Sequence, residues 1–182
     1  MITIGIFVGG QARRMGGVAK GLLPLPGPTT IVQRTLDVVR RQGARAVLVG
    51  QGDAYALDVP SLPDAKRDSG PLGGLLSLLE YADAGHAIAL ACDMPFITDG
   101  LLGRLVAHVS SAPVVAPKRQ GRWEPLFARY DAPRAIEVVR ARLARRELSL
   151  QGLLGELGAD ELPLLPGDDQ LLVDWDRPED VA

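Results

Sequence analysis

A glycine-rich stretch near the amino terminus holds the residues best suited to chemistry. Residues 9–20 read Gly-Gly-Gln-Ala-Arg-Arg-Met-Gly-Gly-Val-Ala-Lys. Because glycine tolerates positive φ and lets the backbone come close to a ligand, successive amide groups of such a loop can surround phosphate oxygens. Arg13, Arg14 and Lys20 add positive charge, and Lys20 is one of only three lysines beside seventeen arginines. The stretch therefore predicts a triphosphate site.

Two better-known phosphate loops do not match this stretch. The ATPase loop needs Gly-x-x-x-x-Gly-Lys followed by Ser or Thr, whereas Lys20 is followed by Gly21. The dinucleotide loop needs Gly-x-Gly-x-x-Gly, which residues 9–11 do not supply. A flexible surface loop with solvated arginines stays open as the alternative, but the position after a buried strand favours phosphate binding.

Aspartates that follow apolar runs are the candidate metal ligands. Asp93 comes directly after such a run and precedes Met-Pro. A carboxylate fixed there suits Mg²⁺, although a turn or cap aspartate is the alternative. Asp174 and Asp176 follow the apolar run 171–173, and alternate residues of an extended chain point the same way. Asp176 with the following Arg-Pro-Glu fits a helix N-terminus equally well, so both interpretations remain.

The other potentially reactive residues give weaker indications of function. Asp64 lies in a polar loop where it could hold a base or a ribose. The two histidines, His86 and His108, lack metal-ligand spacing, and no Gly-x-Ser-x-Gly elbow is present. Cys92 lies in an apolar run and is expected to be a buried small side chain. Hydrolase and thiol chemistry therefore lack their parts.

The elements that must position these residues alternate along the chain. Apolar patterns predict strands at 2–8, 46–49, 86–92, 113–116, 125–130 and 171–173, and a weaker one at 57–62. Helical spacing predicts helices from about 32 to 42 and 75 to 82, after Thr98, from Asp131, and after Ser149. This alternation indicates a parallel sheet covered on both faces, or a mixed sheet if 125–130 is antiparallel. Ligands of such sheets bind outside the carboxyl ends of the strands, so the glycine-rich loop, residues 50–53, Asp93, Asp174 and Asp176 should share one edge.

Composition limits the protein class. With 182 residues, 47% hydrophobic and 23% charged, the chain is expected to form a single domain over 1–182. A net charge of −2 argues against nucleic-acid binding. The single cysteine excludes an internal disulfide. The start lacks a signal-peptide pattern and no apolar run reaches membrane-spanning length, so we expect a cytoplasmic protein without a membrane partner.

With these motifs in order along the chain, the sequence resembles the molybdenum cofactor guanylyltransferases, within the MobA-like NTP transferases. The resemblance is carried by 9–23, Gly-Pro-Leu-Gly-Gly at 70–74, Cys-Asp-Met-Pro-Phe at 92–96, Glu-Pro-Leu-Phe-Ala at 124–128 and Arg-Pro-Glu-Asp at 177–180. It implies an α/β, three-layer Rossmann-like nucleotidyltransferase fold with a mostly parallel, mixed central sheet.

The resemblance also implies an activity. GMP would pass from GTP to the phosphate of molybdopterin, with Mg²⁺ as cofactor and pyrophosphate as the leaving product. Other proteins of molybdenum cofactor biosynthesis are candidate partners. A cytidylyltransferase, a sugar-phosphate nucleotidyltransferase, or a non-catalytic GTP-binding relative are the alternatives. The acceptor is expected to enter from the side of 123–130.

Site residues follow in part from the same resemblance; Arg14, Gly10 and Gly50 are added from the residue pattern and from the charge that the reaction must balance. Metal binding is expected at Asp93, and catalytic roles at Lys20, Arg14 and Asp93. Nucleotide contacts are expected at Phe7, Val8, Gly9, Gly10, Lys20, Gly50, Asp64 and Asp93.

Three departures from the family pattern leave the nucleotide and the acceptor open. Gly50 replaces an asparagine at the end of the second strand. Asp174 and Asp176 replace two asparagines near the end of the chain. Residues 7–8 are Phe-Val where the family has Leu-Ala.

Overall fold

The computed structural model describes residues 2–8, 19–50, 55–66 and 68–175. Seven strands form one central sheet. In spatial order they are β11 (Asp160–Glu161), β7 (Val114–Ala116), β10 (Phe127–Asp131), β6 (His86–Ala91), β1 (Ile2–Phe7), β4 (Arg45–Val49) and β5 (Ser61–Leu62). Neighbouring strands are parallel except where β10 pairs antiparallel with β6 and β7. The prediction of a mostly parallel, mixed sheet is confirmed.

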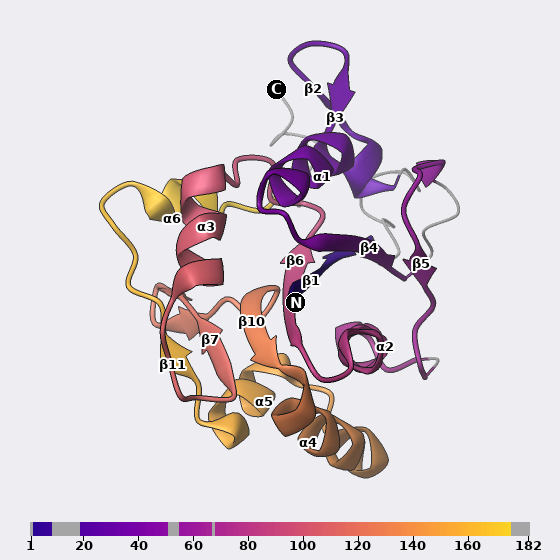
Figure 1. Cartoon of the computed structure of the whole chain (residues 1–182), viewed down its shortest axis with the longest axis vertical. Coiled ribbons are helices and arrows are strands. Elements are labelled where there is room, and N and C mark those ends of the chain that lie inside the picture. Colours follow the sequence, from indigo (N-terminus) through magenta and orange to yellow (C-terminus); the bar gives the residue numbers. More distant parts are fainter. Residues whose placement is uncertain (1, 9–18, 51–54, 67, 176–182) are drawn as a thin grey trace.

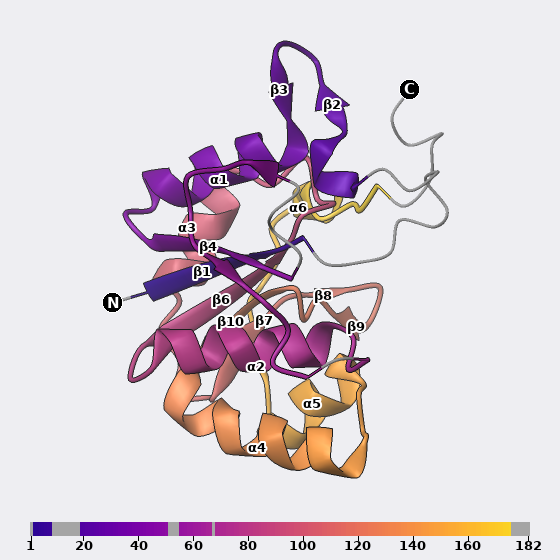
Figure 2. The same ribbon diagram turned by 90° about the vertical axis from the view of Figure 1, so that its right-hand side faces the viewer.

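Helices cover both faces of the sheet and make three layers (Figures 1 and 2). One face carries α1 (Ile31–Arg41), α3 (Asp99–Ala107) and α6 (Asp168–Leu171); the other carries α2 (Pro71–Ala82), α4 (Ala132–Arg145) and α5 (Leu150–Leu157). Each face buries its own apolar cluster, because strands such as β1 point alternate side chains to opposite sides. No helix of the described chain is both long and apolar enough to cross a membrane.

Helix starts follow the side chains that the sequence predicted. The Thr98 hydroxyl accepts a hydrogen bond from Leu101 N, and the Asp131 carboxylate accepts one from Arg134 N. Ser149 caps α5 in the same way. Each cap satisfies an amide that has no partner within the first helical turn.

Several predicted boundaries were wrong. Residues 171–173 do not form a strand, because Leu171 ends α6 and residues 172–175 belong to no helix or strand. This helix is held by Asp168, which pairs with Arg104 and accepts a hydrogen bond from Leu165 N. The predicted strand 57–62 shortens to β5, and α2 begins at Pro71, which suits the first helical position.

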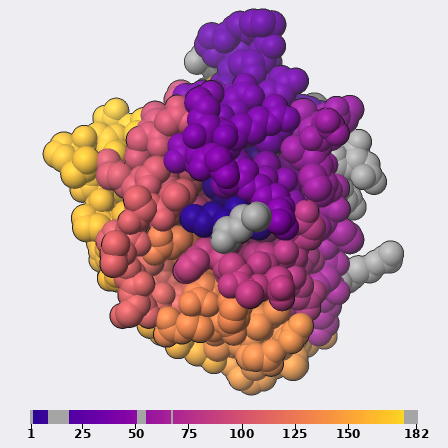
Figure 3. Space-filling view, in the orientation of Figure 1, coloured from indigo at the N-terminus to yellow at the C-terminus, as the bar shows by residue number. Residues whose placement is uncertain are grey.

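Two short hairpins were not predicted. β2 (Pro24–Leu25) and β3 (Thr29–Thr30) form one that projects from the body of the molecule (Figures 1 and 3). β8 (Lys118–Arg119) and β9 (Arg122–Trp123) form the other, which leads into β10.

The reversed direction of β10 decides where this second hairpin lies. Because β10 is antiparallel to β6, its first residues meet the carboxyl end of β6, and Ala91 N donates to Leu126 O at 2.8 Å. Figure 2 shows β8 and β9 at the end of the sheet away from the amino terminus. The hairpin therefore reaches the edge where a parallel sheet binds ligands.

Candidate functional site

The carboxyl ends of three adjacent strands form the first part of the site. Phe7 O, at the end of β1, accepts a hydrogen bond from Cys92 N at 3.2 Å. Val8 N donates to Val49 O at 2.9 Å, and Gly50 N donates to Leu62 O at 2.8 Å. The predicted nucleotide residues Phe7, Val8 and Gly50 thus lie on one edge. Gly9, Gly10 and Arg14 fall outside the described residues.

Lys20 and Asp93 meet at this edge. Lys20 opens the 3-10 turn η2 (Lys20–Leu22), and its Nζ lies 3.0 Å from Asp93 Oδ2. The next residue, Gly21, packs so closely against Tyr55 that a Cβ there would lie 2.8 Å from Tyr55 Cε1. This contact fixes η2 beside Asp93. The structure therefore joins two residues that are 73 positions apart in sequence.

Asp64 lies at the same edge, beside the first turns of α2. A Cβ on Gly74 would lie 3.1 Å from Asp64 Oδ1, 3.1 Å from Phe7 Cε1 and 2.8 Å from Val49 Cγ1. Glycine at this position is what lets the carboxylate come close to the end of β1. Burial raises the pKa of Asp64, so a hydrogen-bond donor on a ligand would relieve the cost of its charge.

Cys92 is buried behind Asp93, as the sequence predicted. Burial and, to a smaller extent, the neighbouring Asp93 charge raise the pKa of its thiol to about 12. The thiol is therefore protonated at neutral pH and is a poor nucleophile.

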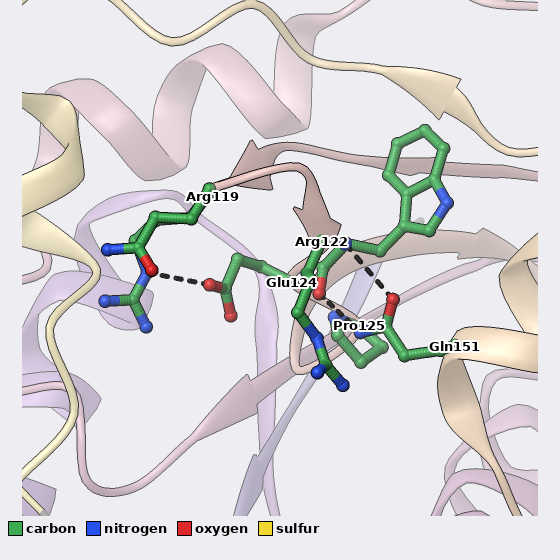
Figure 4. A pocket seen from close by; sticks show the side chains of 7 residues that line it. Arg119, Arg122, Glu124, Pro125 and Gln151 are labelled. Carbon is green, nitrogen blue, oxygen red and sulfur yellow. Dashed lines mark hydrogen bonds and ion pairs between the residues drawn. The ribbon is translucent and has the colours of Figure 1, made fainter.

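Two adjoining hollows make up the second part of the site. The inner hollow is about 230 Å³ and contains Asp93; its lining residues are Ala91, Asp93, Met94, Arg119, Glu124, Pro125, Leu126, Leu150 and Asp174. The outer hollow is about 270 Å³ and lies against the β8–β9 hairpin (Figure 4); its lining residues are Arg119, Gln120, Arg122, Trp123, Glu124, Pro125 and Gln151. They share Arg119, Glu124 and Pro125, so together they extend from Asp93 to α5.

Arg119 connects two carboxylates at the boundary of the hollows. Its Nε donates to Glu124 Oε1 at 2.8 Å, and its Nη2 donates to Asp174 Oδ1 at 3.3 Å. Burial raises the pKa of Glu124, and the Arg119 guanidinium partly offsets that effect. The arrangement holds a planar donor group in a fixed direction beside Asp93.

Asp174 reaches the inner hollow although no strand precedes it. Trp175 N donates to Asp93 O at 2.8 Å, and the Trp175 ring meets Phe96 edge-on with centroids 5.8 Å apart. These contacts dock the segment after α6 onto the loop that follows β6. Asp176 lies outside the described residues.

The β8–β9 hairpin is fixed to α5 by a side-chain amide. Gln151 Nε2 donates to Trp123 O at 2.7 Å, and Gln151 Oε1 accepts from Trp123 N at 3.2 Å. Lys118 Nζ lies 4.3 Å from the centre of the Trp123 ring. Gln151 therefore positions the hairpin and has these hydrogen-bonding groups already occupied.

A metal at this site would rely mainly on ligands from outside the protein. Within the described ranges, no group of three or more His, Cys, Asp or Glu side chains is placed to hold a metal ion. Mg²⁺ fits such a site, because it takes one or two carboxylates together with phosphate oxygens and waters. Two of the candidate metal ligands, Asp93 and Asp174, line the inner hollow; Asp93 pairs with Lys20, and Asp174 pairs with Arg119.

Sequence reasoning missed Arg119 and the pairing of Glu124 with it. One local signal was available. Gln120 and Gly121 both have positive φ, 52° and 76°, as in the tight turns of two-residue hairpin loops. A Gln-Gly pair between two short polar runs could have indicated the hairpin, but nothing local indicates that its arginine meets Asp174.

Comparison with known proteins agrees with this geometry. Residues 4–159 match the model of the MobA-like NTP transferase domain. A molybdenum cofactor guanylyltransferase from Pseudomonas entomophila is 34% identical, over 98% of this chain and 95% of that protein. One from Pseudomonas putida is 33% identical, over 84% of this chain and 81% of that protein.

Solved structures share the fold at lower identity. The molybdopterin-guanine dinucleotide biosynthesis protein A from Archaeoglobus fulgidus has a TM-score of 0.80 and 20% identity, with 98% of this chain and 94% of that chain covered. A 2-C-methyl-D-erythritol 4-phosphate cytidylyltransferase from Thermus thermophilus has a TM-score of 0.69 and 15% identity, with 100% and 94% covered. From the family match and the full-length relatives, this chain belongs to the MobA-like NTP transferase family and is a nucleotidyltransferase.

Proposed function

We propose that the protein transfers GMP from GTP to the phosphate of molybdopterin, with Mg²⁺ as cofactor and release of pyrophosphate. The names of the full-length relatives support the substrates. The observation that carries the proposal is the Lys20–Asp93 pair, which lies at the carboxyl edge of the sheet and beside a hollow able to admit a second substrate.

The nucleotide would lie across the ends of β1 and β4. Phe7 and Val8 lie at this edge, where Phe7 O and Val8 N hydrogen-bond to neighbouring strands, and Gly9 and Gly10 continue from it in sequence. Asp64 would accept hydrogen bonds from the nucleoside. Gly50 would contribute backbone only, which is why guanine selection needs a direct test.

Lys20 and Asp93 would have different roles in binding the triphosphate. Mg²⁺, when bound, supplies charge cancellation and orientation of the phosphate oxygens. Asp93 would hold it, and Lys20 would turn its ammonium from the carboxylate to a phosphate oxygen. Arg14 would add a further cation to balance the charge that develops on pyrophosphate.

The acceptor itself would attack without help from a base. A phosphate monoester has a second pKa of about 6, so it is largely dianionic at neutral pH. Such a nucleophile needs alignment and charge cancellation rather than proton removal. This agrees with the positions of the histidines, because His86 begins β6 at its far end and His108 lies near Asp160 after α3.

The deciding experiment measures pyrophosphate release with molybdopterin and Mg²⁺ and with GTP, CTP or ATP in turn. GTP should give the highest kcat/KM, and chelation of the metal should abolish release. Preference for CTP would make the protein a cytidylyltransferase. Release with a sugar phosphate but not with molybdopterin would change the acceptor. Tight GTP binding with no release for any acceptor would indicate a non-catalytic relative.

A further inference from the structure

The two hollows differ in charge. The described residues that line the outer hollow include two arginines, Arg119 and Arg122, and a single carboxylate, Glu124. Those that line the inner hollow include three carboxylates, from Asp93, Glu124 and Asp174, and one cation, Arg119. An anionic substrate is therefore favoured on the outer side and a metal ion on the inner side.

Arg119 is the cation that both hollows share. Its side chain is 23% exposed, and its hydrogen bonds to Glu124 and Asp174 use Nε and Nη2. Among the described residues, Nη1 makes no hydrogen bond that would occupy it. A guanidinium held in this way presents a planar pair of donors, which matches the geometry of a phosphate group.

We propose that Arg119 binds the phosphate of the acceptor at the boundary of the two hollows. The phosphate then faces Asp93, and the rest of the acceptor lies in the outer hollow against Pro125 and the β8–β9 hairpin. Figure 4 shows Glu124 directed toward Arg119, with Gln151 on the other side of the outer hollow. The inference rests on the proposed function, because it assumes a phosphate monoester as acceptor.

Charge disfavours the alternative placement, in which the acceptor phosphate lies deep in the inner hollow. A dianion deep in the inner hollow would lie beside the carboxylates of Asp93, Glu124 and Asp174, which already engage the nearby cations Lys20 and Arg119. At the boundary the same dianion meets Arg119 directly, and Arg122 lines the space behind it. This placement also leaves room beside Asp93 for the metal and the nucleotide phosphates.

The two carboxylates on Arg119 act differently in this arrangement. Glu124 is 16% exposed and accepts from Nε, so it sets the direction of the guanidinium. Asp174 is 41% exposed and 3.3 Å from Nη2, so its main effect is to oppose an incoming anion. Removing the arginine charge and removing the Asp174 charge should therefore change acceptor affinity in opposite directions.

The test compares Arg119→Gln, Asp174→Asn and the control Arg140→Gln, an exposed arginine of α4 that also pairs with two carboxylates. Molybdopterin and its dephosphorylated form are the probes, with binding measured directly and with KM and kcat measured in the full reaction. For Arg119→Gln we expect the Kd and KM for molybdopterin to rise about tenfold or more. KM for GTP should stay within about twofold of the parent, because the nucleotide does not contact Arg119.

The dephosphorylated probe separates recognition from folding. Its affinity should be the same for the parent and for Arg119→Gln, since the group that Arg119 binds is missing. Asp174→Asn should tighten molybdopterin binding about threefold, as expected for the loss of one exposed like charge. Arg140→Gln should leave both probes unchanged. If Arg119→Gln does not fold, Arg119→Lys carries the test, with an intermediate loss for molybdopterin and none for the dephosphorylated form.

Other outcomes overturn the inference. Unchanged molybdopterin affinity in Arg119→Gln does so, and so does an equal loss for both probes, which would indicate a structural role. Weaker binding in Asp174→Asn together with a higher Mg²⁺ requirement would make Asp174 a metal ligand instead. If the parent binds molybdopterin with the expected Arg119 dependence but releases no pyrophosphate, the proposed function fails while the Arg119 site stands.

Discussion

The proposed nucleotide side and the proposed acceptor side of the site are built in different ways. The nucleotide side consists of the ends of β1, β4 and β6, held by backbone hydrogen bonds such as that between Val8 N and Val49 O. The acceptor side consists of side chains from a hairpin, the start of β10 and the segment after α6, joined through Arg119. The sheet therefore fixes the proposed nucleotide side. The proposed acceptor side depends instead on ion pairs that single substitutions can change.

The largest effect is expected at Asp93, where the two sides meet. Asp93→Ala should lower turnover on the order of 10³-fold, because it removes the carboxylate proposed to hold the metal. Steady-state assays across a Mg²⁺ series measure this, with Asp99→Ala as the control carboxylate that pairs with Arg41 outside the site. Full activity of Asp93→Ala at ordinary Mg²⁺ would place the metal elsewhere.

Lys20 should come next and should affect turnover more than acceptor affinity. Lys20→Ala removes one cation proposed to lie beside the phosphates, so kcat should fall roughly 10²-fold while KM for molybdopterin changes little. The Mg²⁺ requirement should not rise, because Asp93 loses a cationic partner rather than a ligand. Arg41→Ala, which breaks a comparable pair with Asp99, should leave kcat near the parent value. A Lys20→Ala kcat within a few-fold of the parent would contradict the proposed role.

Gly74 tests whether the nucleotide side is set by close packing. A methyl group there would press on Val49, Phe7 and Asp64, so Gly74→Ala should cost about 1–3 kcal/mol in free energy of unfolding. KM for GTP should rise while Kd for molybdopterin stays constant. Gly100→Ala is the matched control, because a Cβ at Gly100 in α3 meets nothing within 4 Å. Equal GTP affinity in both variants would show that Asp64 and Phe7 do not contribute to nucleotide binding.

The smallest effect concerns Glu124 and pH. Burial raises the pKa of Glu124 in the folded protein, so the native state retains its proton at a pH where the unfolded chain has lost it. This contribution to stability is complete below the unfolded pKa and is lost as pH rises through the folded pKa. Glu124→Gln should therefore flatten the decline in free energy of unfolding above about pH 4.5. Urea titrations at several pH values measure it, and identical slopes would rule the effect out.

Sequence patterns predicted the strands of the proposed nucleotide side and their shared edge, because these follow from local signals; nucleotide binding there stays a prediction. Apolar runs located β1, β4 and β6, and the rule for parallel sheets placed Phe7, Gly50 and Asp93 on one edge. The secondary structure of short segments was harder to predict, because three apolar residues such as 171–173 are equally compatible with a strand and with the end of a helix. There the outcome was decided by Asp168, whose partners Arg104 and Leu165 are tertiary.

The acceptor side could not be predicted in the same way. The meeting of Arg119 with Asp174 joins residues 55 positions apart, and it requires that β10 runs antiparallel. Sequence analysis left that direction open. It did indicate 123–130 as the side of acceptor entry; the two hollows adjoin the first residues of that segment, and acceptor entry there stays a prediction.

The β8–β9 hairpin has a practical consequence for engineering. It is one continuous segment, and among the described strands β8 and β9 pair only with each other. The segment leads directly into β10, the antiparallel strand of the central sheet. Grafting another hairpin between Ala116 and Leu126 would thus redesign the proposed acceptor wall while the parallel scaffold stays untouched. A library of variants confined to residues 117–125 could be screened for enzymes that transfer the same nucleotide to other phosphate acceptors.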